Sequence, residues 1–593
     1  MGLTPEQLTL VQSSWSKIDP TDDATADLFY DKLFELDPEL RPLFPFDLLH
    51  RKTKILELIT LAVKGLDNLE QLVHEVEELG RHRVQDCESI DSRTVSAALH
   101  HMLENSLGED DDDDDWDEEL KEAWTITYGV LSKAMIDAAE ATKPPPARIA
   151  VIGCGWWSQG WHLPHLAANA PRVEIAAIVD ASKNPVSTLS SSPLLSISDL
   201  SEKYDCPCFD SVSELLADPI GPKLDGVIVA TSHASHFDVG MSLLNEGIYR
   251  RQIDGKMHRA LSILMEKPMT TDVDEARRLW ETSTTKYPEA AFIINHTASY
   301  RPQTQVARQI IASHQIGKIR HISASMNGPL MWLFDDPKNH SWVSKTPWKN
   351  KGVSSQSEEE ENNTEADEKA EMDGNGYAWG QIAHTLAWIY QVIGADDVAV
   401  PKEVYCTMTH APNTGADIAL AAVITCRDGV VFSLTGTALL PGSEYADPPV
   451  GKHIRVEVFG DDGCLMYGGN DRIPESGRLE VRKTASGTPE DGQSEYPCSA
   501  DRDWSEELGA DAASGLKDGF YFEDGEPGGK GPGSMKAFLD SCTASSLRYF
   551  EGKGMSRPMV NDSLIGLRTV QIIHCMYRSS ISGRAEKIDE EEI

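Results

Sequence analysis

The stretch Arg148-Ile-Ala-Val-Ile-Gly-Cys-Gly-Trp-Trp157 decides the fold of most of this chain. Its apolar, β-branched run predicts a short buried strand that ends at Gly153. Gly153 and Gly155 allow a tight turn in which the backbone approaches a pyrophosphate at the start of a helix. Ser158 stands where the third glycine of such a turn is usual, and Gly160 follows it. The stretch predicts a dinucleotide-binding strand, turn and helix.

A second strand, Val173–Val179, ends in Asp180, about 25 residues after the turn and near the spacing that this fold expects. A carboxylate there accepts hydrogen bonds from ribose hydroxyls and repels a 2′-phosphate. Asp180 therefore favours NAD, whereas Lys183 nearby leaves NADP open. The competing interpretation is that Asp180 only forms a turn at the strand end.

Two further predicted strands each end in a short motif, and the order of these motifs along the chain is informative. One ends at Thr231 in Thr-Ser-x-x-x-His236, and the next runs into Glu266-Lys267-Pro268. This order resembles the Gfo/Idh/MocA oxidoreductases from about residue 148 to the C-terminal helix. The resemblance implies that Lys267 lies at the nicotinamide and contacts the reacting hydroxyl, and that the proline follows a cis peptide bond.

The same resemblance implies which other residues line the nucleotide and substrate site. They are Gly153, Gly155, Asp180, Thr231, His236, Glu266 and Asn295. After about residue 300, alternating strands fit the open antiparallel sheet of the family's second domain. Between them, Gly374–Thr385 resembles a glycine-rich helix start that ends in a histidine, so His384 is expected to be the second catalytic group. A core histidine is the alternative.

One departure concerns the chemistry directly. Many members of the family carry an aspartate four residues before the histidine, and this chain has Gly380 there. Lys267 could still orient an alcohol, with a pKa lowered by burial. His384 could take the hydroxyl proton as hydride leaves for the nicotinamide. With the aspartate absent, the substrate is expected to differ from simple sugars.

The segment before the proline run is helical in pattern. His82 continues an apolar stripe of Leu72, Val76 and Leu79, where it could be a core histidine or a haem ligand. Residues 28–44 and 123–131 resemble bacterial-type globins, including flavohaemoglobins. The resemblance implies His82 as the proximal iron ligand. It also implies three residues beside the haem, namely the distal Tyr30, the haem-wedging Phe44, and Arg51 as the residue best aligned with the usual distal glutamine. His50 and Lys52 are its neighbours, and a haem with His50 facing the iron could be six-coordinate. A globin scaffold without haem is the alternative.

These patterns predict a multidomain chain. We expect an all-α globin at 1–140, a proline-rich linker at 141–147, and an α/β Rossmann NAD(P)-binding domain at 148–298. An α+β domain with an open antiparallel sheet follows at 299–593, interrupted by a disordered acidic insertion at 352–373. The net charge of −41 argues against nucleic acid and anionic membranes as partners. The chain has no apolar run of about 18 residues and no signal-peptide pattern, and its ten scattered cysteines suggest the cytoplasm.

The predicted function joins the two halves. A haem-binding globin that senses or binds O₂ or NO would be coupled to an NAD(P)-dependent oxidoreductase. The oxidoreductase would transfer hydride to or from a sugar- or polyol-like hydroxyl or ketone. The partners would then be a small-molecule substrate and a diatomic gas, and family resemblance suggests a homo-oligomer. A non-catalytic haem-based sensor that keeps a vestigial dehydrogenase scaffold is the alternative from another class.

Overall fold

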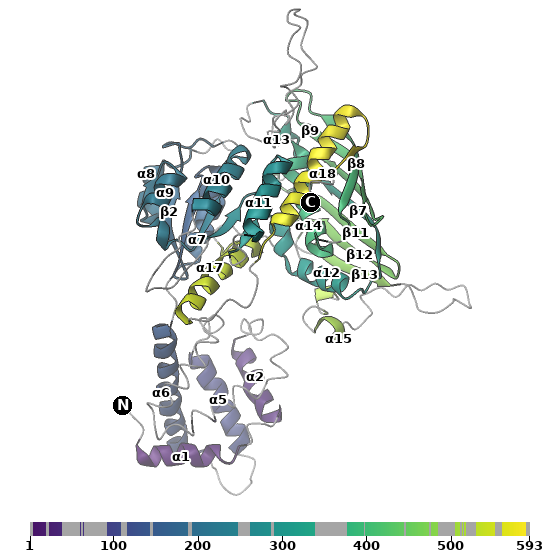
Figure 1. Ribbon diagram of the computed structural model, residues 1–593. Helices are drawn as coiled ribbons and strands as arrows, with labels where there is room; N and C mark the ends of the chain where they lie inside the picture. Colours follow the sequence, from purple (N-terminus) through teal and green to yellow (C-terminus); the bar gives the residue numbers. More distant parts are fainter. Residues whose placement is uncertain are drawn as a thin grey trace, which may run out of the picture. The chain divides into compact units, whose positions relative to one another are not determined.

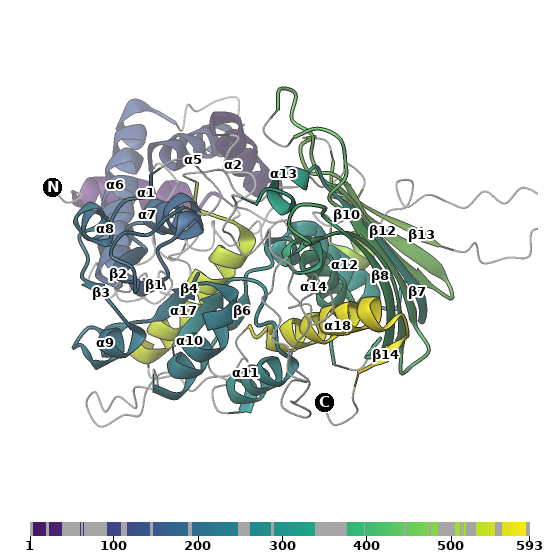
Figure 2. The same cartoon turned by 90° about the horizontal axis from the view of Figure 1, so that it is seen from above.

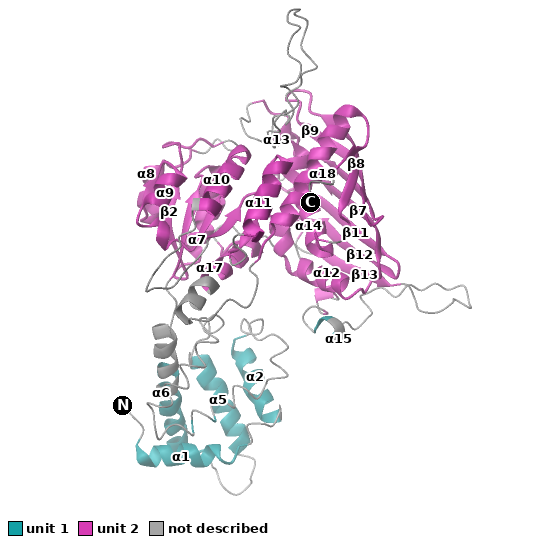
Figure 3. Ribbon diagram, in the orientation of Figure 1, with its two compact units in different colours: residues 1–144, 505–511 teal, residues 145–504, 512–593 magenta. Residues whose placement is uncertain are grey.

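The computed structural model divides the chain into two compact units (Figure 3). One comprises Met1–Pro144 with Ser505–Asp511, and the other comprises Pro145–Trp504 with Ala512–Ile593. The structure describes residues 4–18, 23–37, 60, 63, 92–107, 116–142, 146–187, 193–246, 261–285, 290–337, 376–396, 398–443, 446–473, 476–483, 505–509, 513, 515–516, 529–551 and 560–588. His82, Phe44, Arg51 and the acidic insertion at 352–373 lie outside these ranges.

The first unit is helical in all its described elements. They are α1 (Pro5–Trp15), α2 (Asp23–Leu36), α5 (Ser92–Leu107), α6 (Glu118–Thr142) and the short α15 (Ser505–Leu508). Helix α1 begins with a capping box, in which the Thr4 hydroxyl accepts from the Gln7 backbone and the Gln7 side chain accepts from the Thr4 backbone. The rings of Trp15 and Trp124 meet at 5.6 Å in the core, and the Trp124 indole N–H donates to the Ser14 hydroxyl at 3.0 Å. These paired tryptophans join α1 to α6.

The second unit begins with a six-stranded sheet in the order β3-β2-β1-β4-β5-β6, in which all strand pairs are parallel. Strand β1, which carries the glycine-rich turn, lies between β2 and β4. The strands are β1 (Ala147–Ile152), β2 (Val173–Val179), β3 (Cys208–Phe209), β4 (Gly226–Val229), β5 (Ser262–Met265) and β6 (Phe292–Ile294). The connecting helices are η3 (Ser158–His162), α7 (Leu163–Ala168), α8 (Ile197–Tyr204), α9 (Val212–Ala217), η4 (Gly221–Lys223), α10 (His233–Glu246) and α11 (Val273–Thr285).

A helix from near the end of the chain completes the core of this Rossmann domain. Helix α17 (Gly533–Glu551) places Met535, Phe538, Leu539 and Cys542 in one apolar cluster with Ile149 and Val151 of β1. A side chain at Gly226 of β4 would lie 2.7 Å from the Phe538 ring, so the strand and the helix are in close contact. Figure 1 shows α17, in yellow-green, beside the blue strands and helices of the domain.

The remaining elements form an eight-stranded sheet with helices on one face (Figures 1 and 2). The strand order is β13-β12-β11-β7-β10-β9-β8-β14. The strands are β7 (Ile319–Asn327), β8 (Pro401–His410), β9 (Asp417–Cys426), β10 (Val431–Thr437), β11 (His453–Gly460), β12 (Gly463–Asn470), β13 (Arg478–Lys483) and β14 (Glu586–Lys587). The helices are η5 (Thr297–Tyr300), α12 (Pro302–Ala312), α13 (Met331–Phe334), η6 (Ala378–Ile382), α14 (Ala383–Ile393) and α18 (Ser563–Ser582).

This second sheet is mixed, whereas the sequence analysis expected an antiparallel one. Strands β7 and β10 pair in parallel at the centre, from His321 opposite Val431 to Asn327 opposite Thr437. The glycine-rich segment, α14 and the β8–β9 hairpin lie between these strands in the sequence, which allows β10 to enter beside β7 in the same direction. Buried side chains alternate with exposed ones along β8 and β9, so the other face of the sheet is open to solvent there, with Tyr405 and Val423 exposed.

Across the described ranges, no helix is long and apolar enough to cross a membrane.

Candidate active site

The candidate site lies where the parallel strands of the Rossmann sheet end. Gly153 follows β1, Thr231 lies just beyond β4, and Glu266 and Asn295 follow β5 and β6 directly. The carboxyl ends of parallel strands meet at one edge of a sheet, and ligands bind there in open α/β folds. Most of the residues that the sequence analysis assigned to the site therefore share this edge.

The turn after β1 has the geometry of a nucleotide-binding turn. Gly153 has φ +87°, and an added Cβ would lie 2.6 Å from the carbonyl oxygen of Ala230, so only glycine fits. Around Gly155 and Gly160 nothing lies within 4 Å of an added Cβ, which leaves space above the turn. The buried Ser158 hydroxyl donates to the carbonyl of Gly153. Serine thus braces the turn at the position where the third glycine is usual.

Asp180 lies beside this turn, at the end of β2. Its carboxylate accepts hydrogen bonds from the backbone N–H groups of Cys154 at 2.7 Å and Ser182 at 2.8 Å. These bonds hold an acceptor next to the space above Gly155, which is the position that binds the adenosine ribose in this fold. Lys183 is largely exposed and pairs with Asp210 at 3.3 Å, so part of its charge is already balanced. The residues at the turn therefore fit a dinucleotide.

Glu266 is the most heavily bonded side chain of the site. Its Oε1 accepts from the Asn295 amide at 2.6 Å and from the indole N–H of Trp157 at 2.7 Å, and it lies 2.9 Å from Nε2 of His162. Burial alone would raise the pKa of Glu266. The hydrogen bond and charge of His162, the hydrogen bond of Asn295 and the charge of Lys267 outweigh burial and hold that pKa at about 2. Glu266 is therefore an anion at neutral pH.

Trp157 and His162 were not among the residues that the sequence analysis assigned to the site. Both lie on the segment after the glycine-rich turn, and His162 ends the π-helical turn η3. The Trp157 ring stacks on that of Trp161, with centroids 5.2 Å apart and planes 18° apart. The sequence signal that could have indicated Trp157 is the run of tryptophans after Gly155. An indole beside a binding turn needs a hydrogen-bond acceptor for its N–H, and a nearby carboxylate can supply one.

Lys267 follows Glu266 and precedes Pro268, and the bond between Lys267 and Pro268 is cis, as the resemblance implied. The half-buried ammonium donates to the carbonyl oxygen of Gly380 at 2.8 Å. Burial lowers the pKa of Lys267 to about 8, the charge of Glu266 opposes that decrease, and the charge of Lys452 adds to it. The glycine that replaces the family's aspartate thus presents a backbone oxygen to the lysine.

His384 lies on the first turn of α14, close to Lys267 and beside a second histidine. Its Nδ1 is 3.4 Å from Nδ1 of His296, and the two rings are perpendicular with centroids 5.3 Å apart. Burial lowers the pKa of both side chains, to about 3 for His296 and well below the usual range for His384, and the charge of Lys267 lowers both further. Both rings are therefore neutral at pH 7. His296 was not predicted, because it is distant from His384 in the sequence.

Asn295 and His236 connect the site to its surroundings. The Asn295 side-chain oxygen accepts from the Ser534 hydroxyl at 2.6 Å, which joins the site to α17. His236 is fully buried, with Nδ1 2.8 Å from the carbonyl oxygen of Pro268 and Nε2 3.2 Å from that of Thr231. His236 thus braces the Lys267–Pro268 turn against the end of β4.

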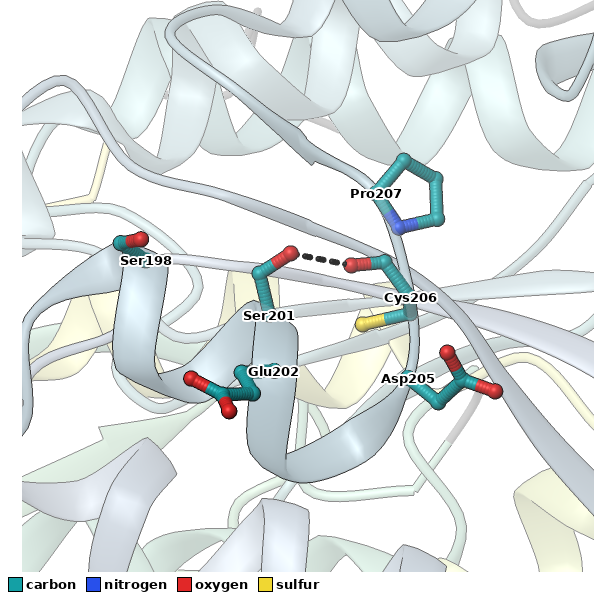
Figure 4. Close-up of a pocket in the computed structure, with 6 residues that line it drawn as sticks. All are labelled: Ser198, Ser201, Glu202, Asp205, Cys206 and Pro207. Atoms are coloured by element: carbon teal, nitrogen blue, oxygen red, sulfur yellow. Dashed lines mark hydrogen bonds between the residues drawn. The ribbon is translucent and has the colours of Figure 1, made fainter.

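A separate surface hollow lies at the other end of the Rossmann sheet (Figure 4). It is lined by the end of α8 and the loop before β3, where the Ser201 hydroxyl donates to the Cys206 carbonyl at 2.6 Å. Helix α8 runs from the carboxyl end of β2 to the amino end of β3, so this hollow lies opposite the edge that carries Lys267. It forms no part of the candidate site.

Comparisons with known proteins agree with this geometry. Residues 147–288 match a family model described as "Oxidoreductase family, NAD-binding Rossmann fold", and residues 304–466 match "GFO/IDH/MocA C-terminal domain". These matches define the class as an NAD-binding oxidoreductase with a Rossmann domain. Beyond its helical N-terminal segment, the chain belongs to the Gfo/Idh/MocA oxidoreductase family.

Among solved structures, the chain is similar to the WlbA dehydrogenase from Bordetella pertussis in complex with NADH and UDP-GlcNAcA. The two are 16% identical with a TM-score of 0.48, over 75% of this chain and 98% of that one. It is also similar to levoglucosan dehydrogenase in complex with NADH and levoglucosan. That pair is 14% identical with a TM-score of 0.47, over 75% of this chain and all of that one.

The N-terminal segment matches globins. It is 28% identical over 148 residues to neuroglobin of Dissostichus mawsoni, which covers 22% of this chain and 90% of the relative. It is 27% identical over 140 residues to the flavohemoprotein of Vibrio cholerae, which covers 23% of this chain but only 34% of that protein. Tyr30 is buried on α2, with its ring edge-on to Phe29 at 5.3 Å and stacked on Phe34 at 5.9 Å.

The charge of Glu266 should set the pKa of Lys267. Replacing Glu266 with Gln keeps the size of the side chain but removes the anion that opposes the lowering, so the pKa of Lys267 should fall below about 8. The measurement is the rate at which an amine-specific reagent modifies Lys267, followed by mass spectrometry across the pH range around that value. Glu202→Gln, at an exposed position of α8, is the control. An unchanged midpoint in Glu266→Gln would contradict this role.

Proposed function

We propose that the second unit is an NAD(P)-dependent dehydrogenase that transfers hydride to or from a sugar- or polyol-like hydroxyl or ketone. The observation that carries the proposal is the convergence of Lys267 and His384 at the edge that bears the glycine-rich turn. Lys267 is placed by its hydrogen bond to Gly380, four residues before His384. A cation of lowered pKa and a neutral imidazole suit alcohol oxidation, because the first can donate to the substrate oxygen and the second can accept the hydroxyl proton.

Each residue has a distinct part in this reaction. The nicotinamide, when bound, supplies the acceptor or donor of hydride. The Lys267 ammonium donates to the substrate oxygen and stabilises negative charge that develops there. His384 takes the hydroxyl proton in the oxidative direction and returns it in the reductive one. Asp180 and the Gly153–Gly155 turn hold the ribose and pyrophosphate, and Asp180 favours NAD over NADP.

His296 is a positioning residue for His384 in this proposal. When Nδ1–H of His384 donates to Nδ1 of His296, Nε2 of His384 is left without a proton and can accept one from the substrate. The family's aspartate would orient the histidine and stabilise its charged form. Gly380 cannot, so the neighbouring imidazole supplies the orientation, and Lys267 bonds to a backbone carbonyl instead of a carboxylate.

For the first unit, we propose a haem-binding globin that binds or senses O₂ or NO. Its likeness to globins supports haem, with His82 as iron ligand and Tyr30, Phe44 and Arg51 around the gas. Of these four, the structure describes Tyr30, which is buried among aromatic rings as a distal residue would be. In a sensor, gas binding would shift the dehydrogenase between states of different affinity. Electron transfer to haem is the second version. Because hydride carries two electrons and haem iron takes one, this version would need free flavin or an outside reductase.

The competing proposal is a haem-based sensor or binding protein whose dehydrogenase fold is only a scaffold. Gly380 in place of aspartate favours it. The hydrogen bonds that hold Lys267, Glu266 and Asp180 favour the enzyme, because a scaffold has no need of a lysine of lowered pKa beside a neutral histidine pair. By its resemblance to the family, we also propose that the chain forms a homo-oligomer through the outer face of the eight-stranded sheet.

Replacing Lys267 with Met separates the two proposals. In the enzyme, loss of the ammonium should lower kcat/KM by about a hundredfold or more, because a positioned proton donor to the reacting oxygen is removed. Binding of NADH should remain within about twofold, since Lys267 is not a nucleotide anchor. The measurement is NADH formation over a panel of sugars and polyols, with NADH fluorescence for binding. Lys536→Met, at an exposed position of α17, is the control. Equal turnover by both variants would end the assignment.

His296→Ala should lower kcat by about tenfold and leave the KM for NAD unchanged, because His384 loses its hydrogen-bonding partner but not its place. The apparent pKa of the base should rise, since His296 contributes to the lowering of the His384 pKa. His296→Gln keeps an acceptor for Nδ1–H and should recover most of the rate. The pH dependence of kcat is the readout. Equal losses in the Ala and Gln variants would point to a structural role alone.

The globin proposal is tested by the absorption spectrum of the full chain after reconstitution with haem and removal of oxygen. We expect a haem band that changes when NO is added, or when CO is added after reduction with dithionite, and that is lost or strongly altered in His82→Ala. Conversion from ferric to ferrous on addition of NADH together with free flavin, and not with free flavin alone, would favour electron exchange between the units. A band untouched by NADH would favour a sensor beside the dehydrogenase, and no band in the parent chain would remove His82 as a ligand.

A further inference from the structure

Lys452 lies at the end of the eight-stranded sheet that faces the catalytic groups. It immediately precedes β11, whose first residue, His453, pairs with Asn327 at the end of β7. A side chain at Gly328 would lie 3.3 Å from Cγ of Lys452, so the lysine stem passes over the end of β7. The Lys452 backbone N–H donates to the Asp471 carboxylate at 2.6 Å, and its carbonyl accepts from the Asp471 backbone. The backbone of Lys452 is therefore fixed on both sides.

The segment that carries Gly380 and His384 is attached to the same end of β7. The Tyr377 hydroxyl donates to the carbonyl oxygen of Met326 at 2.7 Å, and the Thr385 hydroxyl lies 3.5 Å from the Met326 sulfur. The segment that contains His384 and the segment that contains Lys452 therefore meet at the same end of β7. Lys452 is also close enough for its charge to lower the pKa of both Lys267 and His384.

The charges around His384 do not balance. The buried Arg301, which donates to the Tyr467 hydroxyl at 3.0 Å, joins Lys267 and Lys452 as a third cation whose charge acts on His384. Two carboxylates lie near these cations, and both already have partners. One oxygen of Glu266 has three of them, and the Asp471 carboxylate accepts from the Lys452 backbone N–H. Within the described residues, the Lys452 ammonium makes no hydrogen bond or ion pair, and the side chain is half-buried. Such a cation beside two others is unfavourable unless a negative charge joins them.

We propose that Lys452 binds an anionic group of the substrate, a carboxylate or phosphate, so that the substrate is a sugar or polyol acid or phosphate rather than a neutral sugar. This inference rests on the proposed dehydrogenase function. An ammonium is a suitable point-charge partner for either anion. Lys452 belongs to the second sheet, whereas the cofactor pyrophosphate is expected at the Gly153–Gly155 turn, so the anion belongs to the substrate. The excess of positive charge also stands out in a chain of net charge −41.

The test compares charged and neutral probes that share one ring. With the full chain saturated in NADH, dissociation constants are measured by calorimetry for D-glucuronate, D-glucose 6-phosphate and D-glucose. We expect at least one anion to bind about tenfold or more tighter than glucose, and the preference to shrink as salt is added. Lys452→Gln should bring the constants to within about twofold of each other, whereas Lys452→Arg should keep the preference. Lys402→Gln, at an exposed position of β8, is the matched control.

The outcomes separate this inference from the proposed function. If neither anion binds better than glucose, or if Lys452→Gln keeps the preference, Lys452 is not an anion site, even when neutral sugars are oxidised. If the anions bind through Lys452 but none of a panel of sugar acids and sugar phosphates is oxidised with NAD, the anion site stands and the dehydrogenase proposal fails. Preference for glucuronate over glucose 6-phosphate would identify the carboxylate as the group bound, and the reverse would identify the phosphate.

Discussion

The carboxylate of Glu266 is the interaction on which the rest of the site depends. It joins three segments, because Trp157 and His162 come from the segment after β1, Asn295 follows β6, and Glu266 itself follows β5. A buried anion is costly unless its partners are already in place, so these bonds form together or not at all. Through its charge Glu266 also keeps the pKa of Lys267 from falling further. Glu266 thus both joins the segments that form the site and influences the protonation of Lys267.

The local parts of this architecture could be predicted from sequence. The strand before Gly153 and the strand that ends before Asp180 depend on neighbours within a few residues, and residue type reports such short-range constraints. The cis bond between Lys267 and Pro268 was expected from the resemblance to the family. The parallel pairing of β7 with β10 was not predicted. Pairing direction depends on how a long intervening segment folds, and no local pattern records that.

The site residues that were not predicted were missed for a similar reason, because their partners are distant in the sequence. Trp157 and His162 reach Glu266 across more than a hundred positions, and His296 meets His384 across 88. Within one sequence, such pairs leave no signal except an unusual residue type, here the run of tryptophans. Gly380 was recognised as a departure, but its effect was visible only in the structure, where the backbone carbonyl takes the lysine that an aspartate would otherwise hold.

Helix α17 has a consequence for how the protein is made. Its apolar residues pack on β1, Ser534 bonds to Asn295 across 239 positions, and Arg172 pairs with Asp540 across 368. The nucleotide-binding core therefore stays incomplete on the ribosome until α17 has been synthesised, almost 400 residues after β1. The globin-like segment precedes the dehydrogenase, and its helices α1, α2, α5 and α6 lie within residues 5–142. Its core can therefore form before the core of the dehydrogenase is complete. Nascent chains spend that interval with β1 uncovered, which makes it a natural point for chaperone engagement.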